Sequence, residues 1–208
     1  MTTPAAVVHV VDDDGAVRDS LRFLLDAAGF AVRTHASAEA LLSAGPTVSG
    51  CVLTDVRMPG MDGLELLRRL HAAAITVPVV VMTGHADVPM AIRAMKAGAL
   101  DFLEKPFADD ALVAAVRAAL DESRRTAEAR AQSGQASARV AGLTPRERQV
   151  FDLLVEGLPT KAIAKALGAS PRTVEVHRAR VMEKLGARSL PELVRLALVA
   201  RAEPRAGG

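Results

Sequence analysis

Polar residues stand at the ends of several short apolar runs, where their types could carry out phosphoryl chemistry. Asp12 and Asp13 follow the run Val7–Val11, and Asp55 follows the run Cys51–Thr54. Carboxylates held close together repel one another, and this arrangement favours a divalent cation such as Mg²⁺. A carboxylate can also act as the nucleophile that accepts a phosphoryl group. The residues therefore indicate an acidic, metal-assisted site.

Two further groups suit the same chemistry. Thr83 follows the run Val79–Met82, and Lys105 comes shortly after the run Leu100–Leu103. Asp55 would attack a phosphoryl group, Mg²⁺ and Lys105 would neutralise the developing charge, and Thr83 would bind an oxygen of the product. Separate turn-forming or helix-capping roles would not explain why four strand ends agree, although such a role is favoured for Asp14.

The elements that must position these groups alternate between strands and helices. The predicted strands are Val7–Val11, Phe30–Thr34, Cys51–Thr54, Val79–Met82 and Leu100–Leu103. The predicted helices are Val17–Ala28, Ala38–Ala44, Gly63–Ala73, Met90–Ala97 and Asp110–Leu120. Continuous apolar strands are typical of a parallel sheet that is buried on both faces. We therefore predict an α/β fold with a doubly wound five-stranded parallel sheet, in which the acidic residues meet at one edge.

Three segments resemble the receiver domain of two-component response regulators, and the longest of them is particularly similar to the FixJ branch. They are VVDDD at 10–14, DVRMPGMDG at 55–63 and MTGHADVPMAIRAMKAGALDFLEKPF at 82–107. The resemblance implies phosphorylation of Asp55, with Asp12, Asp13, Asp55 and the backbone carbonyl of Arg57 as Mg²⁺ ligands. It also implies that Thr83 and Phe102 form a coupled switch pair and that Lys105 contacts the phosphoryl group. Phe102 stands where many relatives carry Tyr, so a step that needs that hydroxyl is excluded here.

The remainder of the chain has helical signals and no strand. A polar, Ala-rich linker at 122–141 can prolong the preceding helix before it loosens, and it separates a domain at 1–121 from one at 142–202. Thr144 to Glu147 and Ser189 to Glu192 have the pattern of capping boxes, and Ser170-Pro171 opens another helix. Gly168 and Gly186 stand where helices should end. The second domain is therefore predicted to be an all-α, four-helix domain.

Three segments of this domain carry a second resemblance: LTPRERQVFDLLVEGL at 143–158, KAIAKALGASPRTVEVHRARVMEKLGARS at 161–189 and ELVRLAL at 192–198. Through them, residues 143–200 resemble the LuxR-type helix-turn-helix, whose second helix enters the major groove of DNA. Val174, Val181 and Leu185 form an inward stripe at helical spacing, so the intervening positions face outward. The candidate DNA contacts are Lys161, Arg172, Thr173, Glu175, Val176, Arg178 and Ala179. Glu can accept from cytosine and Val or Ala can contact a thymine methyl, whereas the basic groups suit phosphates.

Two positions in this domain depart from the wider family. Glu175 stands where many relatives carry Lys, and Thr160 stands where they carry Asn. DNA contacts at these positions therefore do not follow from the family alone. His177 is expected to be a packed helix residue rather than a metal ligand, and the alternative for the whole domain is a helical protein-interaction module.

Charge divides the chain in the same way as the motifs. Residues 1–122 hold ten Lys and Arg against sixteen Asp and Glu, a net of −6, and residues 123–208 hold sixteen against eight, a net of +8. A basic half makes nucleic acid a candidate partner. The single cysteine, Cys51, excludes an internal disulfide, and no apolar run has the ~20 residues of a membrane span. A cytoplasmic protein without a membrane partner is expected.

Together these features predict a phosphorylation-dependent transcriptional regulator that is not an enzyme. The resemblance implies that a sensor histidine kinase phosphorylates Asp55 and that phosphorylation promotes a homodimer through the face at about Val88–Leu103. The dimer would bind double-stranded promoter or operator DNA, and RNA polymerase is a further candidate partner. The alternative is a phosphatase of the haloacid dehalogenase type, but such enzymes carry Asp-x-Asp after the first strand, whereas the candidate nucleophile here follows the third.

Overall fold

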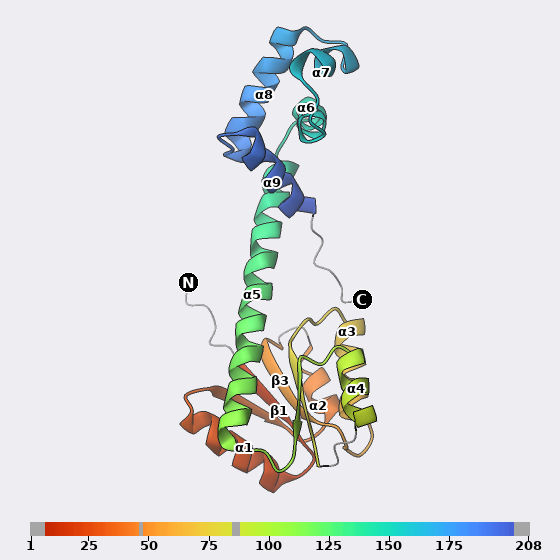
Figure 1. Cartoon of the computed structure of the whole chain (residues 1–208), viewed down its shortest axis with the longest axis vertical. Coiled ribbons are helices and arrows are strands. Elements are labelled where there is room, and N and C mark those ends of the chain that lie inside the picture. Colours follow the sequence, from red (N-terminus) through yellow and green to blue (C-terminus); the bar gives the residue numbers. More distant parts are fainter. Residues whose placement is uncertain (1–6, 46–47, 85–87, 202–208) are drawn as a thin grey trace. The chain divides into compact units, whose positions relative to one another are not determined.

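The computed structural model describes residues 7–45, 48–84 and 88–201. Within them the chain forms two compact units, one that ends at Ala127 and one that begins at Glu128. The first unit has a sheet with helices against it, and the second consists of helices (Figure 1). No described helix combines the length and the apolar character that crossing a membrane would require.

The first unit contains a five-stranded parallel sheet with the order β2-β1-β3-β4-β5. The strands are β1 Val7–Val11, β2 Ala31–His35, β3 Gly50–Asp55, β4 Val79–Thr83 and β5 Asp101–Glu104. The predicted doubly wound sheet is confirmed, with each strand within one residue of its expected start. The central strands β3 and β4 are buried throughout, whereas the edge strands β2 and β5 are partly exposed because each has a neighbour on one side only.

Helices cover both faces of this sheet (Figure 1). The helices before β5 are α1 Gly15–Ala27, α2 Ala38–Leu42, α3 Gly63–Ala72 and α4 Val88–Lys96, and α5 Asp109–Ala141 follows β5. One apolar core joins α2, α3 and α4 to the face that carries Val52 and Val81, and the other joins α1 and α5 to the face that carries Leu53 and Met82. Neighbouring strand residues thus enter opposite cores, which explains the continuous apolar runs in the sequence.

The first helix begins two residues earlier than predicted because Asp14 caps it. The Asp14 carboxylate accepts from the backbone N–H of Ala16 at 2.8 Å and of Val17 at 3.4 Å. These bonds satisfy two donors that the first turn of a helix leaves unpaired. The capping role favoured for Asp14 is therefore confirmed.

The long helix α5, Asp109–Ala141, continues through the whole predicted linker. The expectation that the linker would loosen is wrong, because its Ala, Arg, Glu and Gln residues are good helix formers and outweigh Gly134. Its final turns also belong to the core of the second unit, in which Ala136 and Val140 are buried. In physical terms, residues 128–141 are an additional helix of that unit.

The other helices of the second unit are α6 Pro145–Val155, α7 Thr160–Ala166, α8 Pro171–Leu185 and α9 Leu190–Arg201. They enclose one apolar core, in which Phe151, Ile163 and Leu193 are fully buried. The Thr144 capping box and the Ser170 cap are present as predicted. The second predicted box differs: Ser189 accepts from the N–H of Glu192, but the Glu192 carboxylate accepts from Arg188 instead of Ser189.

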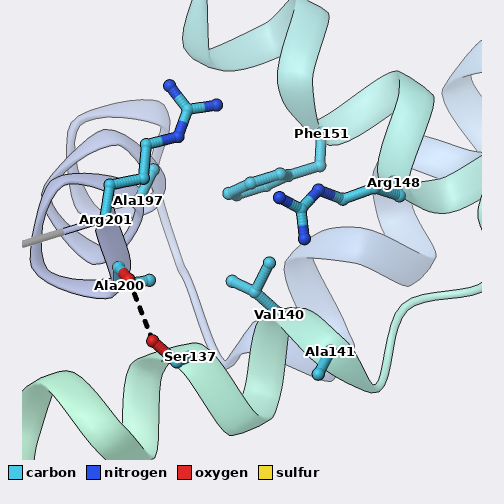
Figure 2. A pocket seen from close by; sticks show the side chains of 8 residues that line it. All are labelled: Ser137, Val140, Ala141, Arg148, Phe151, Ala197, Ala200 and Arg201. Carbon is cyan, nitrogen blue, oxygen red and sulfur yellow. Dashed lines mark hydrogen bonds between the residues drawn. The ribbon is translucent and has the colours of Figure 1, made fainter. Parts of the chain in front are cut away.

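Two hydrogen bonds connect the last part of α5 to the end of α9. Ser133 Oγ donates to the carbonyl of Val199 at 3.0 Å, and Ser137 Oγ donates to that of Ala200 at 2.9 Å (the second bond is drawn in Figure 2). Both carbonyls belong to the last turn of α9, where no intrahelical donor remains. Beside this contact lies a pocket of about 200 Å³, whose lining includes Phe151 beneath the guanidinium of Arg148 (Figure 2).

Candidate functional site

The carboxyl edge of the sheet brings together three of the predicted site residues. Val11 pairs with Thr54, so Asp12 and Asp55 extend from adjacent strands. Lys105 follows the edge strand β5, and its Nζ lies 2.9 Å from Asp12 Oδ2 and 2.7 Å from Asp55 Oδ1. The convergence expected from the strand pattern therefore occurs, with one ammonium between two carboxylates.

The site is partly shielded from solvent. The Asp12 and Asp55 side chains are 3% and 11% exposed, and that of Lys105 is 25% exposed. Burial alone would lower the pKa of Lys105, but hydrogen bonds and charges from Asp55 and Asp12 together raise it above its ordinary value. Lys105 is consequently a stable cation at neutral pH, in a position to attract anionic oxygens.

Backbone groups hold both carboxylates in position. The N–H of Arg57 donates to Asp55 Oδ2 at 2.7 Å, and the N–H of Asp14 donates to Asp12 Oδ1 at 3.0 Å. Arg18, on α1, donates from Nη1 to the carbonyl of Asp12 at 2.7 Å. The sequence reasoning did not find Arg18, because a side-chain bond to a backbone carbonyl leaves no local pattern.

Gly63 keeps the loop after β3 close to the nucleophile candidate. A Cβ at this position would lie 2.2 Å from the carbonyl oxygen of Asp55. The N–H of Gly63 also donates to the carbonyl of Val56 at 3.0 Å, and Asp62 caps the helix that begins here. A glycine directly before an apolar helical run was the available signal for this close approach.

Thr83 and Phe102 lie on the neighbouring strands β4 and β5. Thr83 ends β4 and is buried, and its carbonyl accepts from the N–H of Lys105 at 2.7 Å. Phe102 is half-buried against the core that contains Ala94 of α4. The Lys105–Pro106 peptide is cis.

The donor set suits a hard cation. Two buried carboxylates share a single ammonium, which leaves negative charge on oxygen ligands of the kind that Mg²⁺ prefers. Asp13 is exposed beside them. Within the described part of the chain, no three acidic, His or Cys side chains gather closely enough to make a metal cluster.

In the second unit, the residues predicted to face inward are buried, and most of the candidate DNA contacts are exposed. Val174, Val181 and Leu185 are buried, as their spacing predicted, and His177 is half-buried. The exposed candidate contacts on α7 and α8 are Lys161, Arg172, Thr173, Glu175, Val176 and Ala179, whereas Arg178 is half-buried. The two positions that depart from the wider family touch, because Thr160 Oγ1 donates to Glu175 Oε1 at 2.6 Å.

Two family descriptions match the chain, one in each unit. Residues 8–117 match the response regulator receiver domain. Residues 141–197 match the bacterial regulatory proteins of the luxR family.

Known proteins resemble both units together. The transcriptional regulatory protein FixJ of Azorhizobium caulinodans is 59% identical over 201 residues, which cover 95% of this chain and 94% of that protein. The crystal structure of full-length FixJ from B. japonicum is 54% identical, with a TM-score of 0.58, and the match covers 96% of this chain and 98% of that one. The low-resolution structure of the response regulator StyR is 45% identical, with a TM-score of 0.81, over 93% of this chain and 98% of that one.

Proposed function

We propose that Asp55 is the phosphorylation site of this chain. The chain belongs to the response regulators that join a receiver domain to a LuxR-type DNA-binding domain. It is therefore a phosphorylation-dependent transcriptional regulator. The observation that carries the proposal is the position of Lys105 Nζ, 2.9 Å from Asp12 and 2.7 Å from Asp55. A cation held there can receive the oxygens of an incoming phosphoryl group.

Asp55, Lys105 and Thr83 would each have a separate role in the transfer of the phosphoryl group. An oxygen of Asp55 attacks phosphorus while the bond between phosphorus and the histidine nitrogen of a sensor kinase breaks, so the phosphoryl group passes to the carboxylate. Lys105 holds the phosphoryl oxygens, and the Thr83 hydroxyl donates to one of them. Mg²⁺, held by Asp12, Asp13, Asp55 and the carbonyl of Arg57, would supply further neutralising charge.

The phosphoryl group must favour a second state of the receiver. A modification shifts an equilibrium only through contacts that differ between the two states. Thr83 and Phe102 are the proposed pair, since one ends β4 and the other lies on β5 against the core below α4. The proposed dimer face at 88–103 includes Phe102, so a change at the switch pair can reach it. Ile92, Met95 and Leu100 are exposed on this face.

Phosphorylation then acts on DNA binding. A receiver dimer presents two recognition helices to a two-fold operator, which raises affinity through effective concentration. Lys161, Arg172 and Arg178 would contact phosphates, and Thr173, Glu175, Val176 and Ala179 would face the bases. RNA polymerase is the candidate partner at a bound promoter, and a protein that binds bacterial promoters acts in the cytoplasm.

The family is one of transcription regulators rather than classical enzymes. Nothing in the comparisons supports the phosphatase alternative, and the candidate nucleophile follows β3 rather than β1. We propose that the chain has no substrate turnover beyond its own phosphorylation and dephosphorylation.

Acetyl phosphate with Mg²⁺ tests the acceptor residue. The intact mass of the wild-type chain should increase by one phosphoryl group, and that of Asp55→Asn should not change. Asp62→Asn is the matched control, because Asp62 caps α3 and should leave labelling intact. Equal labelling of wild type and Asp55→Asn would show that another residue is the acceptor.

A further inference from the structure

The hydroxyl of Thr160 contacts the recognition helix at a single carboxylate. Thr160 Oγ1 donates to Glu175 Oε1 at 2.6 Å, from the start of α7 to α8. We infer that Thr160 is a positioning residue for sequence recognition, which orients Glu175 so that its other oxygen accepts from a base edge. The inference rests on the proposed DNA-binding function and assigns a role to a residue outside the recognition helix.

Glu175 is placed to use such an orientation. Its side chain is 53% exposed, and it lies next to the buried Val174 in the N-terminal part of α8. Oε1 receives the Thr160 bond and lies 3.7 Å from Arg178 Nη1. Among the described residues, Oε2 accepts no hydrogen bond, so it is the oxygen available to a partner outside the chain.

Among the described residues, Thr160 Oγ1 makes no hydrogen bond other than the one to Glu175. The preceding residue, Pro159, is the N-cap of α7, and no side chain caps that helix. A hydroxyl at a helix start commonly caps a backbone N–H. Here it points instead to a carboxylate fifteen residues further along the chain, and the short distance is typical of a charge-assisted bond.

Orientation matters because a glutamate side chain has several rotatable bonds. An exposed carboxylate that must be ordered on binding loses rotamer freedom at that moment, whereas one already held loses less. The base-edge donor that suits a carboxylate is the N4 amino group of cytosine. Loss of the Thr160 bond should therefore weaken discrimination at the base pair that Glu175 reads, by about two- to tenfold.

The test is a selection of random DNA duplexes by the full chain after treatment with acetyl phosphate and Mg²⁺. The variants are Thr160→Val, which removes the hydroxyl at constant shape, Thr160→Ser, which retains it, Glu175→Ala, and the double variant Thr160→Val with Glu175→Ala. Relative affinities for the selected duplexes and their single-base variants give a preference at each position. Circular dichroism and the thermal unfolding midpoint establish that each variant is folded.

Thr160→Val should reduce preference at the same base pairs as Glu175→Ala, Thr160→Ser should restore it, and the double variant should match Glu175→Ala. The inference is overturned if Thr160→Val keeps the wild-type preference, if it weakens all duplexes equally, or if its effect adds to that of Glu175→Ala. It also fails if Glu175→Ala leaves the preference unchanged, and the proposed function then survives. If the wild-type chain selects no duplex at all, the proposed DNA-binding function itself fails.

Discussion

At the scale of single residues, Lys105 determines the charge balance of the acidic site. Removing its ammonium in Lys105→Ala leaves Asp12 and Asp55 facing each other with little solvent around them. We expect the variant to be less stable than wild type by about 1–3 kcal/mol at neutral pH, because buried charges have lost their partner. Added Mg²⁺ should stabilise the variant more than wild type, since it supplies the missing positive charge.

Thermal unfolding midpoints with and without Mg²⁺ measure how far Mg²⁺ replaces the positive charge of Lys105. Lys96→Ala is the matched control, because Lys96 is an exposed lysine of the same unit. If Lys105→Ala and Lys96→Ala had the same unfolding midpoint in the absence of Mg²⁺, the charge-balance account would be wrong.

Two histidines on adjacent strands, the buried His9 and the half-buried His35, make folding stability depend on pH. His9 Nδ1 and His35 Nε2, on adjacent strands, share a hydrogen bond of 3.0 Å. Burial, followed by the charge of His35 and a smaller effect of Arg33, lowers the pKa of His9 to about 4. The unfolded chain therefore binds a proton near pH 6.5 that the folded chain takes up only near pH 4, and folding stability falls between these values by up to about 3 kcal/mol.

Urea unfolding of wild type and His9→Gln at pH 7.5 and pH 5 isolates this contribution. The titrating groups other than His9 and its contact His35 have the same surroundings in both chains, so the loss of stability on acidification should be larger for wild type. A loss of equal size in both chains would rule out His9 as its source.

At the scale of elements, the end of α5 is expected to stabilise the DNA-binding unit. A fragment of residues 142–201 lacks the buried Ala136 and Val140 and the serine bonds to the last turn of α9. A fragment of residues 128–201 retains them. Burial of a valine side chain alone contributes about 1.5–3 kcal/mol, so the longer fragment should be more stable by at least that amount.

Urea unfolding of the two fragments compares them directly, and Val140→Ala in the longer one removes apolar burial without shortening the helix. Arg139→Ala is its control, since Arg139 is exposed on the same turn. Equal stability of the two fragments would place the boundary of the domain at 142, as the sequence had suggested.

The elements also show how far the sequence could predict the fold. The sheet followed from runs that enter two cores, and the capping signals at Asp14, Thr144 and Ser170 are local, so they could be read directly. The helical conformation of all of residues 122–141, and the packing of their last turns in the second unit, could not be predicted in this way. Val140 is buried by residues from other helices, and no local pattern records such a partner.

The candidate site also has features that the sequence could predict and features that it could not. Asp12, Asp55 and Lys105 each stand at a strand end, so the sheet topology brought them together once the strands were known. The support from Arg18 and the bond between Thr160 and Glu175 depend on side-chain directions that spacing does not determine. Spacing predicted which residues share an edge, but not which atoms meet.

At the scale of the whole molecule, the separation of charge between the two halves predicts how DNA binding responds to salt. Residues 123–208 carry a net charge of +8, and exposed basic residues such as Lys161 and Arg172 lie on α7 and α8. Each neutralised phosphate releases counterions, so a dimer with ~6–10 phosphate contacts should lose ~10³–10⁵ in affinity between about 50 and 200 mM salt.

The slope of that salt dependence separates phosphate contacts from base contacts. Lys161 lies on α7, which precedes the recognition helix, so its ammonium should meet phosphate oxygens that every sequence shares. Lys161→Ala should weaken binding to all duplexes alike and reduce the logarithmic slope by about one for each Lys161 in contact, whereas Val176→Ala should keep the slope and relax sequence preference. Fluorescence anisotropy over a range of salt concentrations gives both quantities, with Arg117→Ala, at an exposed receiver position outside the proposed dimer face, as the control of equal charge. A wild-type affinity that hardly changed with salt would contradict a phosphate-binding role for the basic unit, and a change of preference in Lys161→Ala would mean that α7, not α8, faces the bases.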